Sequence, residues 1–518
     1  MGQSSIFEFM YDTYKITKPV RIIELFAGYG SQHLALTYLG VDVKGHKIVE
    51  WAVPSIQAYK DLHYGDANTD HTKELTDDEI VNALVEYGIS ANYNEPMTKA
   101  QIKRKGSQWC RNVYNNIKNT NNLVNISNVK AADLEITETD KYDYIMTYSF
   151  PCQDLSLAGK RAGMDEDSET RSSLLWQVQR LLDELNDLNQ LPQVLLMENV
   201  PQVMAQDNLQ NMEKWNAFLS KLGYKSYIKN LIATDYGIPQ IRNRTFMVSI
   251  LGEYSYTFPK PMPLELKLSD MLENKVDEKY FLSERLLKAL STNPKSGYDR
   301  KRQFKNGLYN SNIIGVANMI TTRANDRATD NSIIVSEATE KGFREAHEGD
   351  GVYINRPHQK RGVVQKDKIQ TLKTTVDDIG VVVKDTRTQK EILADDLIKQ
   401  GVVKGGEVIN HSYASSRLNR DRNPIETTDD IMPTLTTRPD TLGVVVKGIA
   451  NKSNAGVGVI ENNLRIRKIT PLEAFRLMGV KDDDYYKIAK NQSDSSLYHL
   501  AGDSIVVNVL MAIFKQLL

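Results

Sequence analysis

The sequence predicts an α/β fold with a second, smaller β-rich domain, and two observations lead to this prediction. Up to about residue 254, short apolar runs alternate with stretches of helical periodicity, the pattern of a parallel sheet flanked by helices. From about 255 to 465, short Val/Ile-rich runs alternate with Thr, Asp, Gly and Arg. Helical periodicity then returns. We therefore predict an α/β domain over 1–254, a β-rich domain over 255–465, and a segment over 466–518 that completes the first domain.

The strands of the α/β domain are predicted where an apolar run is followed by turn residues. They are residues 20–26, 41–51, 142–149, 193–200 and 244–251. Helices are expected after the first strand, where "QHLALTYLG" ends at Gly40, and over the amphipathic stretch 173–185. Residues 64–128 are polar and Asn-rich, and we interpret them as an insertion.

The β-rich domain contains a short sequence pattern that occurs twice, which we call the internal echo. Residues 369–383 and 432–446 share Thr-Leu-x-Thr and Gly-Val-Val-Val in register, and 319–327 resembles a degenerate third copy. The pattern suits repeated hairpins. After this domain, Thr470, Pro471 and Glu473 have the spacing of a helix N-cap with a capping box.

Composition limits the class of protein. The chain has 518 residues, 41% of them hydrophobic, which is enough for a sizeable core. Its two cysteines, Cys110 and Cys152, predict neither a disulfide framework nor a zinc site, and they favour the reducing cytoplasm. We see no secretory signal and no apolar window long enough to span a bilayer, so no membrane role is expected.

The charge pattern leaves a nucleic-acid partner open. A formal net charge of −1 counts mildly against one, but two runs, 98–112 and 294–305, are locally rich in Lys and Arg. Each run is either a binding surface or a solvated face.

The glycine turn in "ELFAGYGS" indicates a ligand site. Gly28 and Gly30 follow a predicted strand, whereas the third glycine of a dinucleotide loop is replaced by His33. Glu50 ends the next strand, where a carboxylate can hold ribose hydroxyls, and Trp51 beside it could stack on adenine. Together these residues fit a nucleoside cofactor without a pyrophosphate. An ordinary α/β turn with an incidental acid is the alternative.

The stretch "SFPCQDLS" places Cys152 after the predicted strand that ends at Ser149. A catalytic thiol needs surroundings that favour the thiolate, and most lone cysteines are simply small buried residues. Here Glu198 follows another strand, and Arg242 and Arg244 precede a third. We therefore expect a nucleophile, a carboxylic acid and arginines to converge on one edge of the sheet.

These motifs together resemble one family. "FAGYG", "EW", "SFPCQDLS", "MENV", "YGIPQIRNR", "RKITPLEAFRLMG" and "GDSIVVNV" stand in the order found in cytosine-5 DNA methyltransferases. The resemblance covers roughly 18–60, 130–252 and 465–518. It implies a Rossmann-like, S-adenosylmethionine-dependent methyltransferase sheet, with 255–465 as the target-recognition domain.

The resemblance also implies a reaction. The Cys152 thiolate would add to carbon 6 of cytosine while Glu198 donates to ring N3, and carbon 5 would then take the methyl group of S-adenosyl-L-methionine. Loss of the carbon 5 proton would release the cysteine. Arg242 and Arg244 would fix the base carbonyl and the local backbone. The implied substrate is double-stranded DNA, and its cytosine would have to be flipped out, since a stacked base is inaccessible to the thiol.

The cofactor residues implied by the resemblance are Phe26, Gly28, Gly30, Glu50, Trp51, Asp133, Pro151, Leu174, Asp503 and Ser504. Asp133 is assigned to the adenine amino group, with Asp66 as a rival. The chain departs from the family's usual pattern at Asp503, where Asn is usual, and at Ser149, where Gly is usual. A charged Asp503 near the cofactor's carboxylate could weaken binding unless it is protonated or turned away.

For DNA, the resemblance implies a mobile loop at 159–163, with Lys160 and Arg161 placed for phosphates. Candidates for reading guanine are Arg323, Arg327, Arg417, Arg420 and Arg438. The hairpin echo permits either one recognition domain built from a duplicated motif or two recognition units.

Two other functions are compatible with some of these motifs. A tRNA cytosine-5 methyltransferase would share these motifs, but it would not need the long β-rich domain. An inactive DNA-binding regulator would not need Cys152, Glu198 and Arg244. We expect a monomeric cytoplasmic enzyme of a restriction-modification system, with a cognate restriction endonuclease, or of a phage that evades one.

Overall fold

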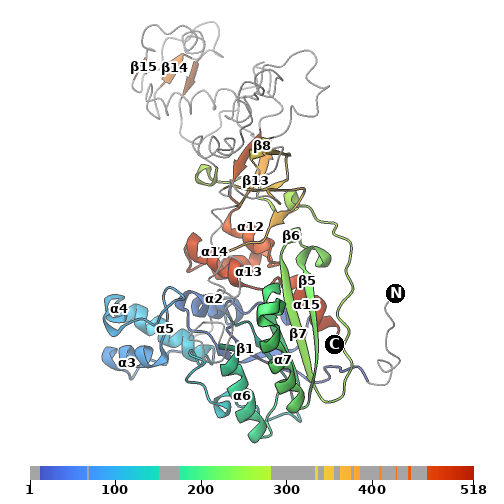
Figure 1. Ribbon diagram of the computed structural model, residues 1–518. Coiled ribbons are helices and arrows are strands. Elements are labelled where there is room, and N and C mark those ends of the chain that lie inside the picture. Colours follow the sequence, from blue (N-terminus) through green and yellow to red (C-terminus); the bar gives the residue numbers. More distant parts are fainter. Residues whose placement is uncertain are drawn as a thin grey trace, which may run out of the picture.

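The computed structural model describes residues 12–66, 69–150, 174–281 and 464–518, and shorter stretches at 333–336, 343–354, 362–374, 379–384, 408–410, 427–428 and 442–444. Its centre is a six-stranded sheet in the order β2-β1-β3-β4-β7-β5 (Figure 1). The strands are β1 (Val20–Leu25), β2 (Val43–Val49), β3 (Asp143–Tyr148), β4 (Val194–Asn199), β5 (Tyr224–Ile232) and β7 (Asn243–Leu251). All five predicted strands are confirmed, and β5 is an addition.

The prediction of a parallel sheet is wrong at one strand. Strands β1 to β4 run parallel, but β7 is antiparallel to both β4 and β5. Only residues 233–242 join β5 to β7, and a parallel connection needs a longer crossover. As a result the start of β7 lies beside the end of β4, where Thr245 pairs with Asn199.

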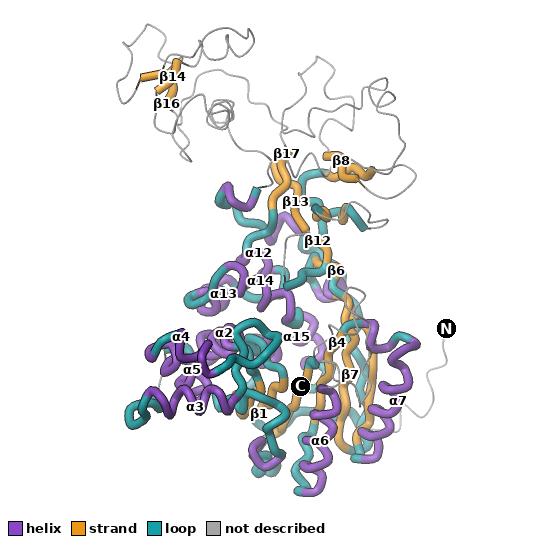
Figure 2. The backbone as a smooth tube through the Cα atoms, turned by 60° about the vertical axis from the view of Figure 1, so that its left-hand side comes forward, coloured by secondary structure: helices purple, strands orange, loops and turns teal. Residues whose placement is uncertain are grey.

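Helices cover both faces of the sheet (Figures 1 and 2). One core contains residues of α1 (Ser31–Tyr38) and α15 (Val507–Lys515), and the other contains residues of α6 (Leu175–Asp187) and α7 (Gln206–Lys221). Along β1, Ile22 belongs to the first core and its neighbour Ile23 to the second, as the two-residue period of a strand requires. The α/β fold is therefore a three-layer sandwich, and α15 completes it.

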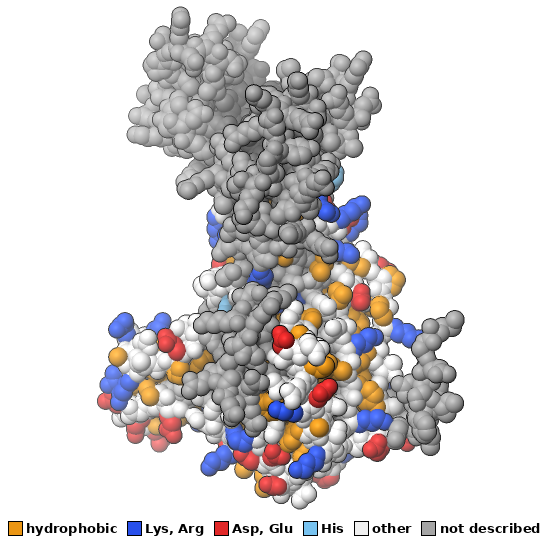
Figure 3. Space-filling model, in the orientation of Figure 1, with side chains coloured by type: hydrophobic (Ala, Val, Ile, Leu, Met, Phe, Trp, Pro, Cys, Tyr) orange, Lys and Arg blue, Asp and Glu red, His pale blue; other side chains and the backbone are white. Residues whose placement is uncertain are grey.

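The insertion is helical, which its polar sequence did not predict. After α2 (Val53–His63) come α3 (Asp77–Tyr87), α4 (Lys99–Arg104) and α5 (Ser107–Asn119). They form a lobe at the side of the sheet that carries both basic and acidic side chains (Figure 3). Lys103 lies 2.8 Å from Asp78, and Arg111 lies 2.6 Å from Asp77. The basic run 98–112 is thus partly neutralised by α3.

The described part of the β-rich region consists of small sheets. One has the order β11-β10-β13-β17, and others pair β8 with β9 and join β15, β14 and β16. Their bounds are β8 Ile333–Ser336, β9 Phe343–Ala346, β10 Gly351–Tyr353, β11 Val364–Gln365, β13 Ile379–Lys384, β14 Val408–Asn410, β15 Thr427–Thr428, β16 Leu442–Val444 and β17 Leu464–Arg467. The Gly-Val segments of the two sequence echoes fall in β13 and β16, each paired antiparallel with its neighbours. Residues 294–305 and 319–327 lie outside the described residues.

Gln240 holds three distant segments together. It lies in β6 (Gln240–Ile241), which pairs with β12 (Ile369–Gln370). Its Nε2 donates to the Leu477 carbonyl at 2.7 Å, and its Oε1 accepts from the Leu372 N–H at 3.1 Å. The β-rich region and the C-terminal helices are therefore anchored to the sheet at one buried amide.

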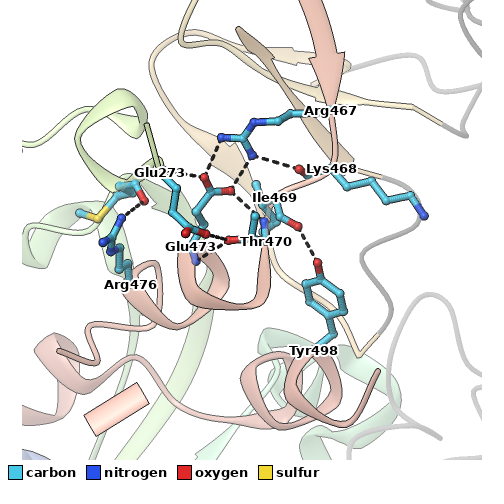
Figure 4. Close-up of polar contacts among 9 residues, drawn as sticks. Glu273, Arg467, Lys468, Ile469, Thr470, Glu473, Arg476 and Tyr498 are labelled. Carbon is cyan, nitrogen blue, oxygen red and sulfur yellow. Dashed lines mark hydrogen bonds and ion pairs between the residues drawn. The ribbon is translucent and has the colours of Figure 1, made fainter. Parts of the chain in front are cut away.

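A buried ion pair holds the chain in place where it passes from the β-rich region back to the C-terminal helices (Figure 4). Arg467 binds Glu473 through two hydrogen bonds, at 2.7 and 2.6 Å, and both side chains are buried. Glu473 also accepts from the Thr470 N–H at 2.8 Å, so the predicted capping box at the start of α12 (Pro471–Arg476) is confirmed. Helices α13 (Asp482–Ala489) and α14 (Asp494–Asp503) follow. The 3₁₀ turns are Ala131–Leu134, Pro201–Met204, Ala233–Tyr236, Leu268–Met271 and Glu278–Tyr280.

The prediction that no apolar window is long enough to span a bilayer is wrong for one stretch. Within the part of the chain that the structure describes, Asp494–Lys515 is long and apolar enough by composition to cross a membrane, and 61% of its apolar window is buried in the protein. It comprises α14 and α15, which are separated at residues 504–506. Its apolar side chains belong to the core shared with α1.

Candidate active site

A cavity of ≈ 450 Å³ opens at the carboxyl ends of the parallel strands. Its walls include residues that follow or end β1, β2, β3 and β4, namely Phe26–Gly28, Val49–Trp51, Ser149–Phe150 and Glu198–Val200. Because β2 and β3 lie on opposite sides of β1, the strand order reverses here, which is where ligands bind in open α/β sheets.

The glycine turn after β1 has an unusual backbone. Phe26, Gly28 and Gly30 all have positive φ, at 62°, 57° and 80°. A Cβ on Gly30 would come within 2.5 Å of the side chains of Tyr59 and His63, whereas one on Gly28 would meet nothing within 4 Å. Gly30 is thus required by the packing behind the turn, and Gly28 leaves open space beside the cavity wall.

Glu50 is oriented by backbone donors from two strand ends. Its Oε2 accepts from the Gly28 N–H at 2.9 Å, and its Oε1 accepts from the Ala52 N–H at 2.7 Å. Burial raises the pKa of Glu50 to about 7. The carboxyl group lines the cavity beside Trp51, so the structure brings together the turn, the acid and the aromatic ring.

Glu198 and Arg244 meet at another part of the wall. Arg244 Nε lies 3.1 Å from Glu198 Oε1, because the antiparallel direction of β7 brings its start to the end of β4. Burial raises the pKa of Glu198, while the positive charges of Arg244 and Arg242 act in the opposite direction. A carboxyl group with a raised pKa is better able to donate a proton at neutral pH.

Arg242 lines the same cavity, but its guanidinium binds backbone carbonyls. Its Nη1 donates to the Leu372 carbonyl at 3.0 Å, and its Nη2 donates to those of Gly502 and Ser504 at 2.9 and 2.6 Å. Ser504 is buried, and its hydroxyl donates to the Leu500 carbonyl at 2.7 Å. The geometry fits the backbone-fixing role expected for the two arginines, with Arg242 as the residue that performs it.

Asn199 holds the segment that leads to the cysteine. Its Nδ2 donates to the Phe150 carbonyl at 3.0 Å, and its Oδ1 accepts from the Val200 N–H at 2.8 Å. Pro151 and Cys152 lie outside the described residues, as do Lys160 and Arg161 of the predicted loop and the guanine candidates Arg323, Arg327, Arg417, Arg420 and Arg438.

The acid predicted to bind the adenine amino group, Asp133, does not line the cavity. Asp133 is exposed, and its Oδ2 accepts from the Lys130 N–H at 2.9 Å as the cap of a 3₁₀ turn. Its rival Asp66 is also exposed, 3.3 Å from Lys490. The wall is formed instead by Val124–Ser127, while the predicted Leu174 does line the cavity. The prediction of Asp133 is therefore wrong, because its distance along the chain from Cys152 does not show which stretch forms the cavity wall.

The comparisons decide the family. The model of the family described as "C-5 cytosine-specific DNA methylase" matches residues 84–518. The chain belongs to this family. The methylase is thus an enzyme that methylates carbon 5 of cytosine in DNA.

Curated relatives agree. The methylase is 36% identical over 277 residues to orphan methyltransferase M.SssI of Spiroplasma monobiae, covering 52% of this chain and 69% of the relative. It is 35% identical over 273 residues to type II methyltransferase M2.ScrFI of Lactococcus lactis subsp. cremoris, covering 51% and 70%. It is 26% identical over 450 residues to orphan methyltransferase M.SPRI of Bacillus phage SPR, covering 78% and 88%.

Several wall residues of the methylase were not expected from the sequence. They are Tyr93 and Asn94 of the insertion, Val124–Ser127 at its end, Ser31 and Gln32 of α1, and His499 of α14. Asn125 Oδ1 accepts from the Ser127 N–H at 3.1 Å, which forms a tight turn at the wall. The wall residues of the insertion lie in loops outside its helices, where helical periodicity places no side chain.

Beneath the glycine turn, the methylase buries a network of titratable groups. Tyr59 donates to Glu24 Oε2 at 2.7 Å, His33 Nδ1 lies 3.2 Å from the Tyr59 hydroxyl, and His33 and His63 stack at 4.2 Å. Burial raises the pKa of Glu24 to about 7 and lowers that of His33 to about 4. At neutral pH the imidazole of His33 is therefore uncharged.

Glu24 predicts a pH dependence of stability. Its folded pKa of about 7 lies above the ordinary value of 4.5, so the folded state holds the proton longer than the unfolded state. Its contribution to stability is then fully present below about pH 4.5 and is lost as the pH rises to about 7, by about 3 kcal/mol in total. Glu24→Gln should flatten the fall in unfolding free energy between pH 5 and pH 7.5, measured by urea unfolding. A slope equal to that of the wild type would contradict the buried-proton assignment.

Proposed function

We propose that the methylase transfers the methyl group of S-adenosyl-L-methionine to a cytosine flipped out of double-stranded DNA at one short sequence. The observation that supports this most is a single cavity with two chemically different parts. Gly28, Glu50 and Trp51 form one part, and Glu198 and Arg244 the other. The same cavity therefore has a part suited to a nucleoside and a part suited to a nucleobase.

The groups at the first part fit the proposed methyl donor. Glu50 offers carboxyl oxygens for ribose hydroxyls, Trp51 and Phe26 offer aromatic faces for adenine, and the Gly28 turn permits close approach. When bound, S-adenosyl-L-methionine supplies an electrophilic methyl group. Pro151 and Leu174 are proposed as further wall residues of this site, and Leu174 lines the cavity.

At the second part, Glu198 would hold a proton against ring N3, and Arg244 would orient both the acid and the base. Cys152 is proposed as the nucleophile, since Phe150, two positions before it, lines the cavity next to Glu198 and Asn199. Arg242 is proposed to hold the backbone at Gly502 and Ser504 on the donor side.

Sequence recognition is assigned to 255–465, whose described strands form small antiparallel sheets anchored through Gln240. We keep one recognition domain with a duplicated motif as the simpler proposal. Relatives named as type II and orphan methyltransferases, one of them from a phage, support a role in restriction-modification or in evading it. We infer a cytoplasmic monomer that protects DNA from a cognate restriction endonuclease.

Bisulfite sequencing tests the proposal. DNA from cells that express the methylase should contain unconverted cytosines within one short motif, and DNA from cells that express Cys152→Ala should convert fully. Two protected motifs would support two recognition units. Complete conversion in both strains would contradict the DNA assignment, and the same comparison on transfer RNA would then test the RNA alternative.

A further inference from the structure

The insertion carries basic side chains that neither the chemistry nor the sequence recognition proposed above uses. Lys99, Arg104 and Lys105 lie on or directly after α4, and all three are exposed. Lys103 and Arg111 of the same basic run are paired with acids of α3, whereas these three have no ion-pair partner among the described residues. We call Lys99, Arg104 and Lys105 the α4 cluster.

Helix α4 is held in one orientation that leaves the cluster in solvent. The Thr98 hydroxyl accepts from the Gln101 N–H at 3.3 Å, as part of a capping box at the start of the helix. Ile102 is fully buried, and its carbonyl accepts from the Cys110 thiol at 3.6 Å. Arg104 follows Ile102 by two positions, roughly 200° around a helix, so the two side chains point in opposite directions. The cluster is therefore presented by a packed helix.

The helical lobe of the insertion separates its charges. The first turn of α3 contains Asp77, Asp78 and Glu79. Acidic side chains gather along the lower edge of the lobe, near α3, and basic ones lie above them, near α4 (Figures 1 and 3). In both views of the backbone, α4 is on the side of the lobe nearer to the β-rich region (Figures 1 and 2). The cluster is thus on the side where DNA is expected, because sequence recognition is proposed for that region.

The cluster is also near the cavity. Asn94 lines the cavity and Lys99 follows five residues later, so their Cα atoms are at most about 18 Å apart. The lobe is attached to the cavity wall by the hydrogen bond from the Ser90 N–H to the Trp51 carbonyl, at 2.8 Å. Phosphates of one DNA strand are spaced about 3.4 Å apart along the helix axis. About five phosphates on each side of a nucleotide in the cavity therefore lie within that distance along the axis.

We propose that the α4 cluster binds phosphates of the DNA backbone beside the site of methylation, so that the insertion is a second DNA-contacting lobe. Exposed ammonium and guanidinium groups without acidic partners are complementary to a polyanion, and contacts with phosphates carry no sequence information. The cluster adds affinity for any duplex, while the β-rich domain selects the sequence. This inference rests on the proposed function for its partner, DNA.

The salt dependence of DNA binding tests the inference, with the full-length protein and fluorescence anisotropy of a labelled duplex of about 40 base pairs. The triple variant Lys99→Gln, Arg104→Gln, Lys105→Gln should bind about tenfold more weakly at about 0.1 M salt. The slope of log affinity against log salt concentration should become shallower by about 2 to 3, because each lost phosphate contact removes about 0.9. The loss should be the same on a duplex of another sequence. Unchanged affinity and slope would overturn the proposal.

Two controls separate a local contact from an effect of net charge. Lys214→Gln, Lys221→Gln, Lys229→Gln removes the same charge from exposed positions of α7 and β5, whereas the insertion adjoins β2 at the other edge of the sheet. This variant should bind DNA within about twofold of the wild type. Exchanging Lys for Arg and Arg for Lys throughout the α4 cluster keeps its charge and should preserve the affinity. Equal losses in the two Gln variants would contradict a specific role for the cluster.

The affinity for S-adenosyl-L-methionine, measured by isothermal titration calorimetry, reports whether the lobe keeps its structure. Tyr93 and Asn94 line the cavity and the α4 cluster does not, so the Gln variant of the cluster should bind the donor as the wild type does. A parallel loss of donor and DNA affinity would mean that the variant acts through the structure of the insertion, and the phosphate contact would be rejected. If the wild type binds no duplex, the proposed function itself fails, which differs from equal binding by the wild type and the variant.

Discussion

Replacing Cys152 with Ser should abolish methyl transfer while DNA binding stays within about tenfold of the wild type. The hydroxyl of serine is far less nucleophilic than a thiolate, so the adduct at carbon 6 would not form, whereas the surfaces that hold DNA are unchanged. Incorporation of tritiated methyl groups measures the methyl-transfer activity, and a gel-shift titration measures the affinity for DNA. A loss of binding that parallels the loss of activity would count against a purely chemical role.

The chain offers its own control for this substitution. Cys110 is the other cysteine, and it is buried in the insertion, where its thiol donates to the Ile102 carbonyl at 3.6 Å. Cys110→Ser should therefore leave the transfer rate near that of the wild type. An equal loss in both variants would point to a general sensitivity of the protein to thiol replacement.

Replacing Glu198 with Gln should lower kcat by about 10² to 10⁴-fold. The amide keeps the shape and can still donate a hydrogen bond, but it has no acidic proton to give to ring N3. Because burial raises the pKa of Glu198, the wild-type rate should fall as the pH rises and Glu198 ionises, and the variant should lose that limb of the profile. Single-turnover rates across pH measure both effects.

Glu135→Gln provides the comparison for Glu198→Gln. Glu135 also pairs with a basic side chain, Lys47 at 2.8 Å, but it is exposed and lies outside the cavity wall. Its replacement should leave the rate and the pH profile unchanged. A near-normal rate for Glu198→Gln would contradict the assignment of Glu198 as the acid.

The centre of the sheet could be predicted because β1, β3 and β4 are apolar runs that are buried on both faces, whereas most residues of the unpredicted β5 are not buried. The glycine turn and Glu50 could be placed at one edge of that sheet because they follow adjacent strands. The convergence of Arg244 with Glu198 was also expected, yet it depends on β7 running antiparallel, which the predicted parallel sheet did not include. Residues that precede a parallel strand would lie at the opposite edge.

Other parts of the site depend on tertiary contacts that no local pattern reports. Asp133 has the right chemistry and a reasonable distance from Cys152 along the chain, but its carboxylate caps a 3₁₀ turn away from the cavity. Tyr93 lies in a loop between two helices of the insertion, and this loop is held by the hydrogen bond from the Ser90 N–H to the Trp51 carbonyl. His499 lies four positions before Asp503, a helical spacing, but only the fold shows that both side chains line the cavity.

The cavity is built from residues that the ribosome makes at very different times. Phe26 and Gly28 emerge early in synthesis, whereas His499, Asp503 and Ser504 emerge hundreds of residues later. Contacts between such distant parts of a chain form slowly and only after both parts exist. A nascent methylase therefore has no complete binding site while most of it is already outside the ribosome, and modification of DNA must wait until synthesis has passed Ser504.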